Sequence, residues 1–369
     1  VFGVCQDTDN IFDVGVCTHF SQQKGIVELN LESIKDAGIS AIRDEVAWSA
    51  LERTKGELNM PERFDQYVRK VTEEGVDVML ILDYANPFYD DGDRPRSPEA
   101  IEGFCRYSEY VVKHFGKKVQ WYEIWNEWDI PIGLPERHRK KDGEPNRGSA
   151  EDYFELLKAV YKKIKAVDAD MTVIGGCPTP GGVRQGWLEK LVQLGGLDYC
   201  DMISIHTYNY GMQGLERTPE AWYDWMLEVQ AMLRRYNGGI DPEFCITEMG
   251  WPTHIGKRET SPELSASYLA RLYLLARTLP SFMGLWWYDF QDDGWNPEYN
   301  EHNFGIVRPD LTPKPSYYVM SDISMLVRQG EYIDRLNTSD EKLWILHFRQ
   351  DQADVWAVWS GDDRERQII

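Results

Sequence analysis

The feature that most constrains the fold is a repeated alternation between short apolar runs and longer amphipathic stretches, from about residue 12 to about residue 290. Some runs are almost wholly apolar, such as Val78-Met79-Leu80-Ile81-Leu82, which is typical of a strand covered on both faces of a parallel sheet. We expect eight strands: Phe12–Val16, Ala41–Arg43, Val76–Leu82, Trp121–Trp125, Thr172–Gly175, Met202–Ile205, Phe244–Thr247 and Gly284–Trp287. Eight strand–helix units in about 280 residues fit the size of a closed (β/α)8 TIM barrel.

Helix signals lie between these runs. Ser149 with Asp152 forms a capping-box start, after which apolar residues recur at three-to-four spacing: Tyr153, Leu156, Leu157, Val160, Tyr161 and Ile164. Three further helices are expected to begin at a hydroxyl cap followed by proline and glutamate, in Ser97-Pro98-Glu99, Thr218-Pro219-Glu220 and Ser261-Pro262-Glu263. An open doubly wound sheet is the alternative, but no G-x-G-x-x-G follows the first strand and no Walker motif occurs.

The pattern changes after the eighth unit. Phe304–Val307 and Pro313–Tyr318 indicate a short extension that leads to a closing helix, Ser316–Val327. Three later runs alternate like antiparallel strands: Tyr332–Leu336, Leu343–Phe348 and Val355–Trp359. We therefore expect an N-terminal segment (residues 1–11), a barrel (12–327) and a β-strand extension or partial β-sandwich (328–369).

Charge and composition limit the partners. The formal net charge of −21 argues against nucleic acid and anionic membrane surfaces, and it suits a neutral or at most a cationic ligand. No apolar run approaches the roughly 18 residues of a membrane span, so none is expected. Val1–Asn10 lacks the layout of a signal peptide, although a mature secreted protein would look the same. Six cysteines without C-x-x-C spacing leave the disulfide state open, and the sequence does not indicate an oligomeric state.

Two strand ends carry the residues that point to a reaction. In a (β/α)8 barrel the working side chains follow the C-terminal ends of the strands. The fourth strand runs into Glu127, which two tryptophans flank, and the seventh into Glu248. We expect aromatic surroundings to raise the pKa of Glu127 toward that of a general acid. Two carboxyl groups across a barrel mouth are what glycosidic cleavage requires. The alternative is that each glutamate only forms an ion pair.

These motifs resemble a known group of enzymes. Asn126-Glu127 and Glu248 are similar to the signature of clan A glycoside hydrolases, which are retaining (β/α)8 enzymes. The fuller match, Trp125–Asp129 with Thr247–Trp251, looks most like family 39. Leu82-Asp83-Tyr84-Ala85-Asn86-Pro87 resembles the PslG-like exopolysaccharide endoglycosidases of bacteria. The resemblance covers the whole barrel, and it favours a periplasmic or secreted protein.

The resemblance implies roles in catalysis or substrate binding for four residues. Glu127 would be the acid/base and Glu248 the nucleophile. Asn126 would bind the 2-hydroxyl of the substrate, a contact that strengthens in the transition state. Arg43 would keep the nucleophile ionised, although it could instead pair at the surface with a neighbouring acid.

It also implies a second set of substrate-binding residues. His206 and Tyr208 match a histidine–x–tyrosine motif whose tyrosine contacts the nucleophile. Trp287 would floor the subsite of the attacked sugar, with the preceding tryptophan pointing the other way. Trp48 and Asn86 complete the candidates. His206 as a plain rim histidine and Trp287 as a core residue are the alternatives.

The expected function is a retaining glycoside hydrolase that cleaves β-glycosidic bonds inside a bacterial polysaccharide or exopolysaccharide. The high aromatic content, with 14 Trp and 20 Tyr, suits sugar rings, which stack on indoles. An exo-acting β-xylosidase-like enzyme and an inactive carbohydrate-binding barrel remain alternatives. The basic run Arg137–Lys141 is either a solvated loop or a contact for acidic sugars. No metal or cofactor is expected, because no H-x-H follows the first strand and His19 has no evident partner.

Overall fold

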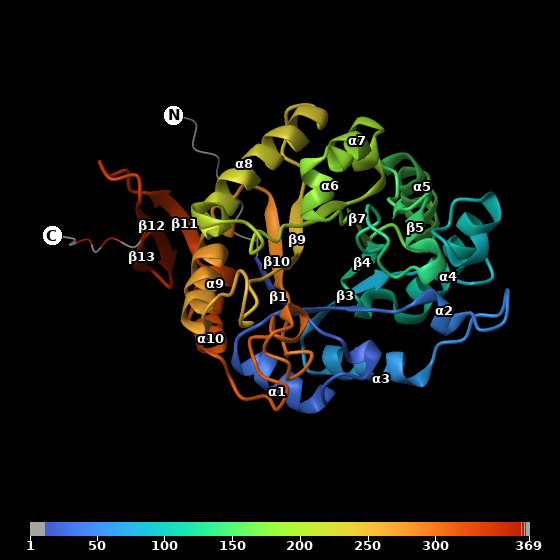
Figure 1. Cartoon of the computed structure of the whole chain (residues 1–369), viewed down its shortest axis with the longest axis horizontal. Helices are drawn as coiled ribbons and strands as arrows, with labels where there is room; N and C mark the ends of the chain where they lie inside the picture. The colour runs from blue at the N-terminus through green and yellow to red at the C-terminus, as the bar shows by residue number, and fades with distance from the viewer. Residues whose placement is uncertain (1–11, 363, 365, 367–369) are drawn as a thin grey trace.

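Parallel strands close into a barrel in a computed structural model that describes residues 12–362, 364 and 366. Its strand order, β1-β10-β9-β8-β7-β4-β3-β2, confirms the (β/α)8 prediction (Figure 1). The barrel strands are β1 (Asp13–Cys17), β2 (Ala41–Glu45), β3 (Asp77–Leu82), β4 (Trp121–Ile124), β7 (Thr172–Gly176), β8 (Met202–His206), β9 (Phe244–Met249) and β10 (Phe282–Trp287). The expected N-terminal segment, residues 1–11, lies outside the described residues.

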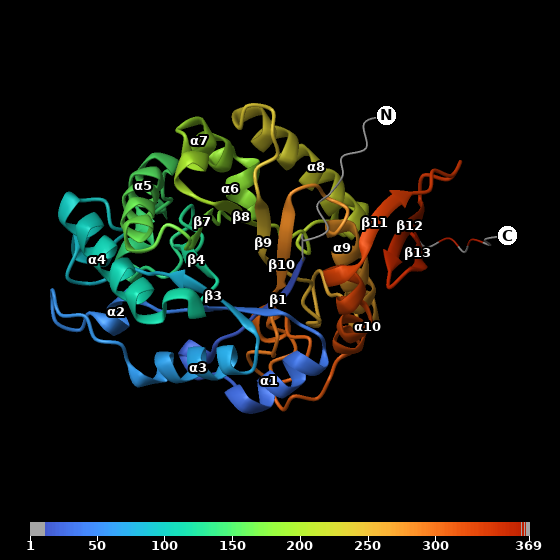
Figure 2. The ribbon, with the colours of Figure 1, turned by 180° about the vertical axis from the view of Figure 1, so that it is seen from behind.

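Helices surround the barrel on its outer side (Figures 1 and 2). They are α1 (Val27–Asp36), α2 (Trp48–Leu51), α3 (Glu62–Glu73), α4 (Pro98–Phe115), α5 (Ala150–Val167), α6 (Pro180–Arg184), α7 (Trp187–Gln193), α8 (Pro219–Tyr236), α9 (Pro262–Ala276) and α10 (Pro315–Gln329). The four predicted caps are present: the side chains of Ser97, Ser149, Thr218 and Ser261 each accept a backbone N–H of the first turn. Each cap fixes where a strand-to-helix loop ends, and these loops carry the site.

The barrel interior is filled by small and medium side chains and by the indole of Trp286, which Trp121 meets edge to face. This cluster consists of Cys17, Ala41, Met79, Ile174, Met202, Cys245 and Trp286. Trp286 fits because Gly15, on the neighbouring strand β1, has no side chain where the indole lies. Successive side chains of a strand point to opposite faces, so Trp287 points outward and packs against Trp251 in the helical layer.

The predicted antiparallel extension is a separate sheet in the order β11-β12-β13. Its strands are β11 (Glu331–Arg335), β12 (Leu343–Gln350) and β13 (Ala353–Ser360). Trp344, Leu346 and Phe348 are buried, and the ring of Trp344 meets the edge of Tyr223 on α8. The Trp359 indole N–H donates to Glu220 Oε1 of the same helix at 2.7 Å. The sheet therefore packs on the helical layer, away from the barrel mouth (Figure 2).

Among the described residues, no helix has both the length and the apolar character needed to cross a bilayer. The described cysteines, Cys17, Cys105, Cys177, Cys200 and Cys245, are free thiols.

Replacing Gly15 with alanine should lower the free energy of unfolding by about 1–3 kcal/mol, because the new Cβ would lie 2.3 Å from Trp286 Cδ1. Thermal unfolding followed by tryptophan fluorescence measures this change. Gly181→Ala is the matched control, because the nearest atoms to its Cβ are 3.4 Å away or more and alanine favours a helix. Equal melting temperatures for the two variants would show that the indole does not need this space.

Candidate active site

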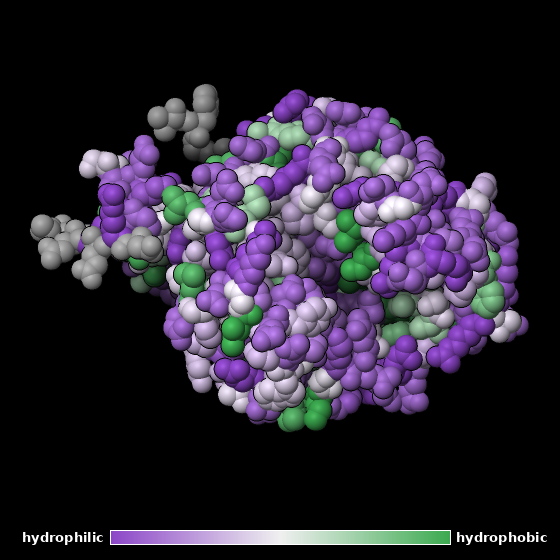
Figure 3. Space-filling model, viewed as in Figure 1, coloured by the Kyte–Doolittle hydropathy of each residue, from purple (hydrophilic) through white to green (hydrophobic). Residues whose placement is uncertain are grey.

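A cavity of about 480 Å³ opens at the C-terminal end of the barrel, where the space-filling surface is hollowed (Figure 3). Its size is within the 300–1,000 Å³ range of small-molecule sites. Lining residues come from the ends of seven of the eight strands, all except β7. Among them are Glu127 from the loop after β4, Glu248 from β9, Arg43 from β2 and Tyr208 from the loop after β8.

The structure brings the two glutamates together. Each side chain is 12% exposed, and a carboxylate oxygen of Glu127 lies within 4.8 Å of one of Glu248. Retaining glycosidases hold their two carboxyl groups about 5–5.5 Å apart, whereas inverting enzymes leave about 6.5–9.5 Å for a water molecule. The observed approach fits the retaining geometry.

The loop that carries Glu127 has an unusual backbone. Trp125 and Glu127 have φ values of 69° and 49°, in the left-handed region that non-glycine residues seldom adopt. Backbone hydrogen bonds hold the loop, since Trp125 N–H donates to Leu82 O and Glu127 N–H to Cys177 O. The rings of Trp125 and Trp128 pack edge to face in the core. The two indoles therefore anchor the loop from below and, contrary to our expectation, do not line the cavity beside Glu127.

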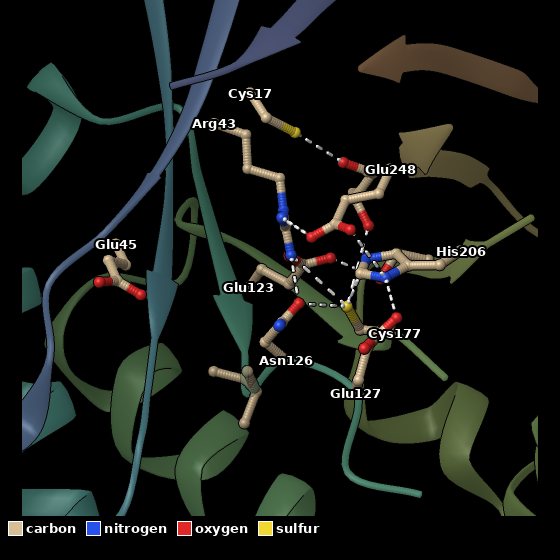
Figure 4. Close-up of polar contacts among 12 residues, drawn as sticks. Cys17, Arg43, Glu45, Glu123, Asn126, Glu127, Cys177, His206 and Glu248 are labelled. Atoms are coloured by element: carbon tan, nitrogen blue, oxygen red, sulfur yellow. Dashed lines mark hydrogen bonds and ion pairs between the residues drawn. The ribbon is translucent and has the colours of Figure 1, made fainter. Parts of the chain in front are cut away.

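Arg43 connects the groups around Glu248 (Figure 4). Its guanidinium is 3% exposed and donates to Glu248 Oε1 at 2.7 Å and to Glu123 Oε2 at 2.7 Å. A third bond runs from Nη2 to Asn126 Oδ1 at 3.0 Å. The alternative of a surface pair with Asp44 is wrong: Asp44 instead accepts from the Thr18 hydroxyl and from backbone N–H groups.

The environments of the two glutamates shift their pKa values in opposite directions. Burial raises the pKa of Glu127, against the opposing effect of His206. Burial alone would also raise the pKa of Glu248, but His206, Arg43 and the Tyr208 hydroxyl together lower it. Tyr208 Oη donates to Glu248 Oε2 at 2.8 Å. One carboxyl group thus favours its acid form and the other its anion, as an acid and a nucleophile require.

His206 lies between the two carboxyl groups and is fully buried. Its Nδ1 is 2.9 Å from Glu127 Oε1 and 3.4 Å from Glu248 Oε2. Its other ring nitrogen, Nε2, is 3.1 Å from Cys177 Sγ. The ring therefore joins both glutamates to a group that the sequence patterns did not mark.

Three candidates do not reach the cavity. Trp48 stacks on Tyr89 in the core, the Asn86 amide donates to the Glu52 carbonyl, and Trp287 faces the helical layer. We correct their expected position, because all three are buried away from the cavity wall. The aromatic residues that line it are Tyr84, Tyr208, Tyr210, Tyr288 and Phe304. Tyr84 lay within a motif noted from the sequence, and Tyr288 directly follows Trp287.

Glu123 and Cys177 also belong to the site and were missed. Glu123 is a charged residue inside the strand run Trp121–Ile124, and its position under Arg43 depends on the strand register. Cys177 follows β7, whose end carries no charged residue. The sequence offered one signal for such residues, a charged residue within an apolar strand. This signal applies to Glu123 but not to Cys177.

Two groups among the described residues bring three possible metal ligands together: Glu127, His206 and Glu248, and His19, Asp289 and Asp293. Protein cations already contact both groups, Arg43 at Glu248 and Lys24 at Asp293. His19, expected to lack a partner, is 3.1 Å from Asp289 and 3.2 Å from Asp293.

Replacing Arg43 with methionine should destabilise the protein by about 3–5 kcal/mol, because Glu123 and Glu248 would lose their buried cation. Guanidinium unfolding followed by tryptophan fluorescence measures the loss. The exposed pair Lys55–Glu99 supplies the control, since Lys55→Met should change stability by no more than about 1 kcal/mol. If both variants unfold at the same denaturant concentration, the buried network does not depend on Arg43.

Known proteins support a glycosidase assignment. A family model described as Cellulase (glycosyl hydrolase family 5) matches residues 6–266. No curated protein sequence matches the chain. Among solved structures, a family 39 glycoside hydrolase from the gut symbiont Bacteroides cellulosilyticus WH2 is 27% identical over 96% of this chain and 71% of that chain, with a TM-score of 0.77. This likeness confirms the expected similarity to family 39, whereas the PslG-like branch stays a prediction.

More distant structures share the fold. A monomeric β-xylosidase from Caulobacter crescentus CB15 is 15% identical over 91% of this chain and 71% of that chain, with a TM-score of 0.63. A variant of GH5_18 from Streptomyces cattleya is 12% identical over 87% of this chain and 81% of that chain, with a TM-score of 0.66. The chain thus spans only part of each longer enzyme. It belongs to the cellulase family, glycosyl hydrolase family 5, within the retaining glycoside hydrolases of clan A.

Proposed function

We propose that the protein hydrolyses β-glycosidic bonds by double displacement, with Glu248 as nucleophile and Glu127 as acid/base. The observation that carries this proposal is the pair of carboxyl groups within 4.8 Å of each other in one cavity. Their opposite pKa shifts suit the two roles, because the nucleophile must be ionised when the acid is protonated.

In the first step Glu248 Oε attacks the anomeric carbon while Glu127 donates its proton to the departing glycosidic oxygen. Arg43 and Tyr208 keep the attacking carboxylate ionised and hold its orientation. In the second step Glu127 takes a proton from water, and that water replaces Glu248 at the same carbon. We propose that Asn126, which lines the cavity next to Glu127, contacts the 2-hydroxyl.

The cavity wall favours neutral or cationic sugars over uronic acids. Beyond the two catalytic candidates, it presents the carboxyl groups of Asp44, Glu45, Asp293 and Glu301. The wall also carries Lys24, His19 and Arg43, but each is already paired: Lys24 and His19 with Asp293, at 2.7 and 3.2 Å, and Arg43 with Glu248 at 2.7 Å. Close to a fixed carboxylate, an anionic sugar would be repelled.

The basic run Arg137–Lys141 does not line this cavity. Arg137 pairs with Asp91 in an exposed position, and the run continues into a small hairpin of β5 (Lys140–Lys141) and β6 (Glu144–Pro145). Both observations support the interpretation of the run as a solvated loop.

A β-linked polysaccharide, cut within the chain, is the substrate that we propose. The open cavity at the barrel mouth and its five aromatic lining residues support a sugar polymer. The Streptomyces cattleya structure was solved in complex with Manβ1-4GlcNAc, a β-linked disaccharide, which supports the linkage type. Bacterial exopolysaccharide remains the first substrate to try because of the motif from Leu82 to Pro87.

Replacing Glu248 with alanine should reduce turnover of an aryl β-glycoside by about 10⁴-fold or more while the protein stays folded, because Glu123 still pairs with Arg43. Azide should restore product of the opposite anomeric configuration, because it attacks from the face that the carboxylate has vacated. Proton NMR of the product identifies the anomer. A chelator should leave wild-type turnover unchanged. If neither the wild type nor the variant releases product and both bind the glycoside equally well, the inactive carbohydrate-binding barrel would be favoured.

Digestion of β-linked polysaccharides, including bacterial exopolysaccharides, should yield a ladder of oligosaccharides from the first minutes. Mass spectrometry of the digest over time measures the product sizes. Monosaccharide as the sole product from the start would reject action within the chain and favour the exo-acting β-xylosidase-like alternative.

A further inference from the structure

Cys177 is a fully buried thiol at the centre of the site that the double displacement does not use. It follows β7, and its Sγ is 3.1 Å from His206 Nε2 and 3.6 Å from Arg43 Nη2 (Figure 4). The thiol also lies 3.8 Å from Asn126 Oδ1 and 3.9 Å from Thr247 Oγ1. One sulfur atom therefore meets side chains from β2, β8, β9 and the loop after β4.

The backbone of Cys177 is also tied to the acid/base candidate. Its carbonyl accepts the N–H of Glu127 at 3.0 Å, and its own N–H donates to Ser204 O at 2.8 Å. Cys177 has a φ of 53°, in the left-handed region that side chains rarely adopt. Such conformations persist where the surrounding structure holds them, and they cluster at functional sites.

The donors around the sulfur favour a fixed proton on one of the two ring nitrogens of His206. An arginine N–H can only donate, so Arg43 Nη2 points a hydrogen at Sγ. Burial raises the pKa of the Cys177 thiol, which therefore stays protonated and can donate to Asn126 or Thr247. A sulfur that accepts from these surroundings favours a hydrogen on His206 Nε2 as well. Nδ1 is then the ring position that exchanges a proton with Glu127 Oε1.

We propose that Cys177 is a positioning residue that keeps His206 protonated at Nε2, so that the exchangeable proton stays between His206 Nδ1 and Glu127 until the leaving oxygen takes it. This inference rests on the proposed acid/base role of Glu127. During glycosylation that proton moves to the leaving oxygen, which also keeps the electron pair of the broken C–O bond. During deglycosylation water returns a proton to Glu127. The thiol keeps its own proton throughout.

Loss of the sulfur should lower the pH at which the Glu127–His206 pair loses the proton that it gives to the leaving group. In Cys177→Ala the Nε2–H has no acceptor, which costs most when the ring is positively charged, because hydrogen bonds of charged groups are stronger. The neutral ring with hydrogen on Nδ1 then gains, and it stabilises the carboxylate of Glu127. The basic limb of the kcat/KM profile should therefore move to lower pH by about 0.5–1 unit.

Two leaving groups separate this role from a structural one. The wild-type enzyme is first shown to hydrolyse the phenyl and 2,4-dinitrophenyl β-glycosides of one sugar. On the basic limb, Cys177→Ala should lower kcat/KM for the phenyl glycoside, whose leaving group needs a proton, by about 3- to 10-fold, the factor that a shift of 0.5–1 pH unit gives. The dinitrophenyl glycoside, which needs none, should lose less than about 3-fold. Cys177→Ser, which keeps an acceptor, should recover part of the loss. Cys105→Ala, another buried thiol but on α4, should behave as the wild type.

A measurement without substrate tests the same point. In protein labelled with [15N]histidine, the Nε2 resonance of His206, assigned by its loss in His206→Asn, should show a protonated nitrogen in the wild type and in Cys177→Ser. In Cys177→Ala the proton should shift toward Nδ1. Equal losses on both glycosides with an unchanged Nε2 resonance would overturn the role of Cys177. If instead Glu127→Ala hydrolyses both glycosides like the wild type, the proposed acid/base role itself fails.

Discussion

The active site depends on one buried charge. Arg43 lies inside the barrel, 3% exposed, where an unpaired guanidinium would be costly. Glu123 below it and Glu248 above it supply two carboxylates, and the amide oxygen of Asn126 takes a third hydrogen bond. These partners come from different strands, so the pairing also fixes how β2, β4 and β9 meet at the mouth of the barrel. The candidate nucleophile, Glu248, is therefore also one of the groups that balance the buried charge of Arg43 in the barrel interior.

The same arrangement explains how two like residues acquire different chemistry. Glu248 receives hydrogen bonds from Arg43 and Tyr208, whereas Glu127 faces His206 from a loop whose backbone is held by Cys177. Desolvation acts on both carboxyl groups, but only the first has direct cationic and hydroxyl donors that outweigh it. His206 contacts both glutamates, so protonation of one carboxyl group changes the pKa of the other.

Much of this could be predicted from sequence. Period and apolar content located the barrel strands within one or two residues, and hydroxyl–proline–glutamate triplets located helix starts, because both are local effects. Glu127 and Glu248 were predictable because strand ends face the same mouth. Trp287 was expected in the cavity from the resemblance, but its side chain packs in the helical layer, Trp286 fills the barrel interior, and Tyr288, the next residue, lines the wall. Cys177 was not predictable, because its partners come from four other parts of the chain.

Trp125, Glu127 and Cys177 all adopt left-handed backbone conformations, which typically cost about 1–3 kcal/mol each for such side chains. Glycine would relax that cost, so a search for stabilising substitutions would be drawn to these positions. Gains made there would loosen the loop that carries Glu127, the proposed acid/base, and would move the thiol that contacts His206. Efforts to make this enzyme more heat-resistant therefore have better prospects in its outer helices than at the barrel rim.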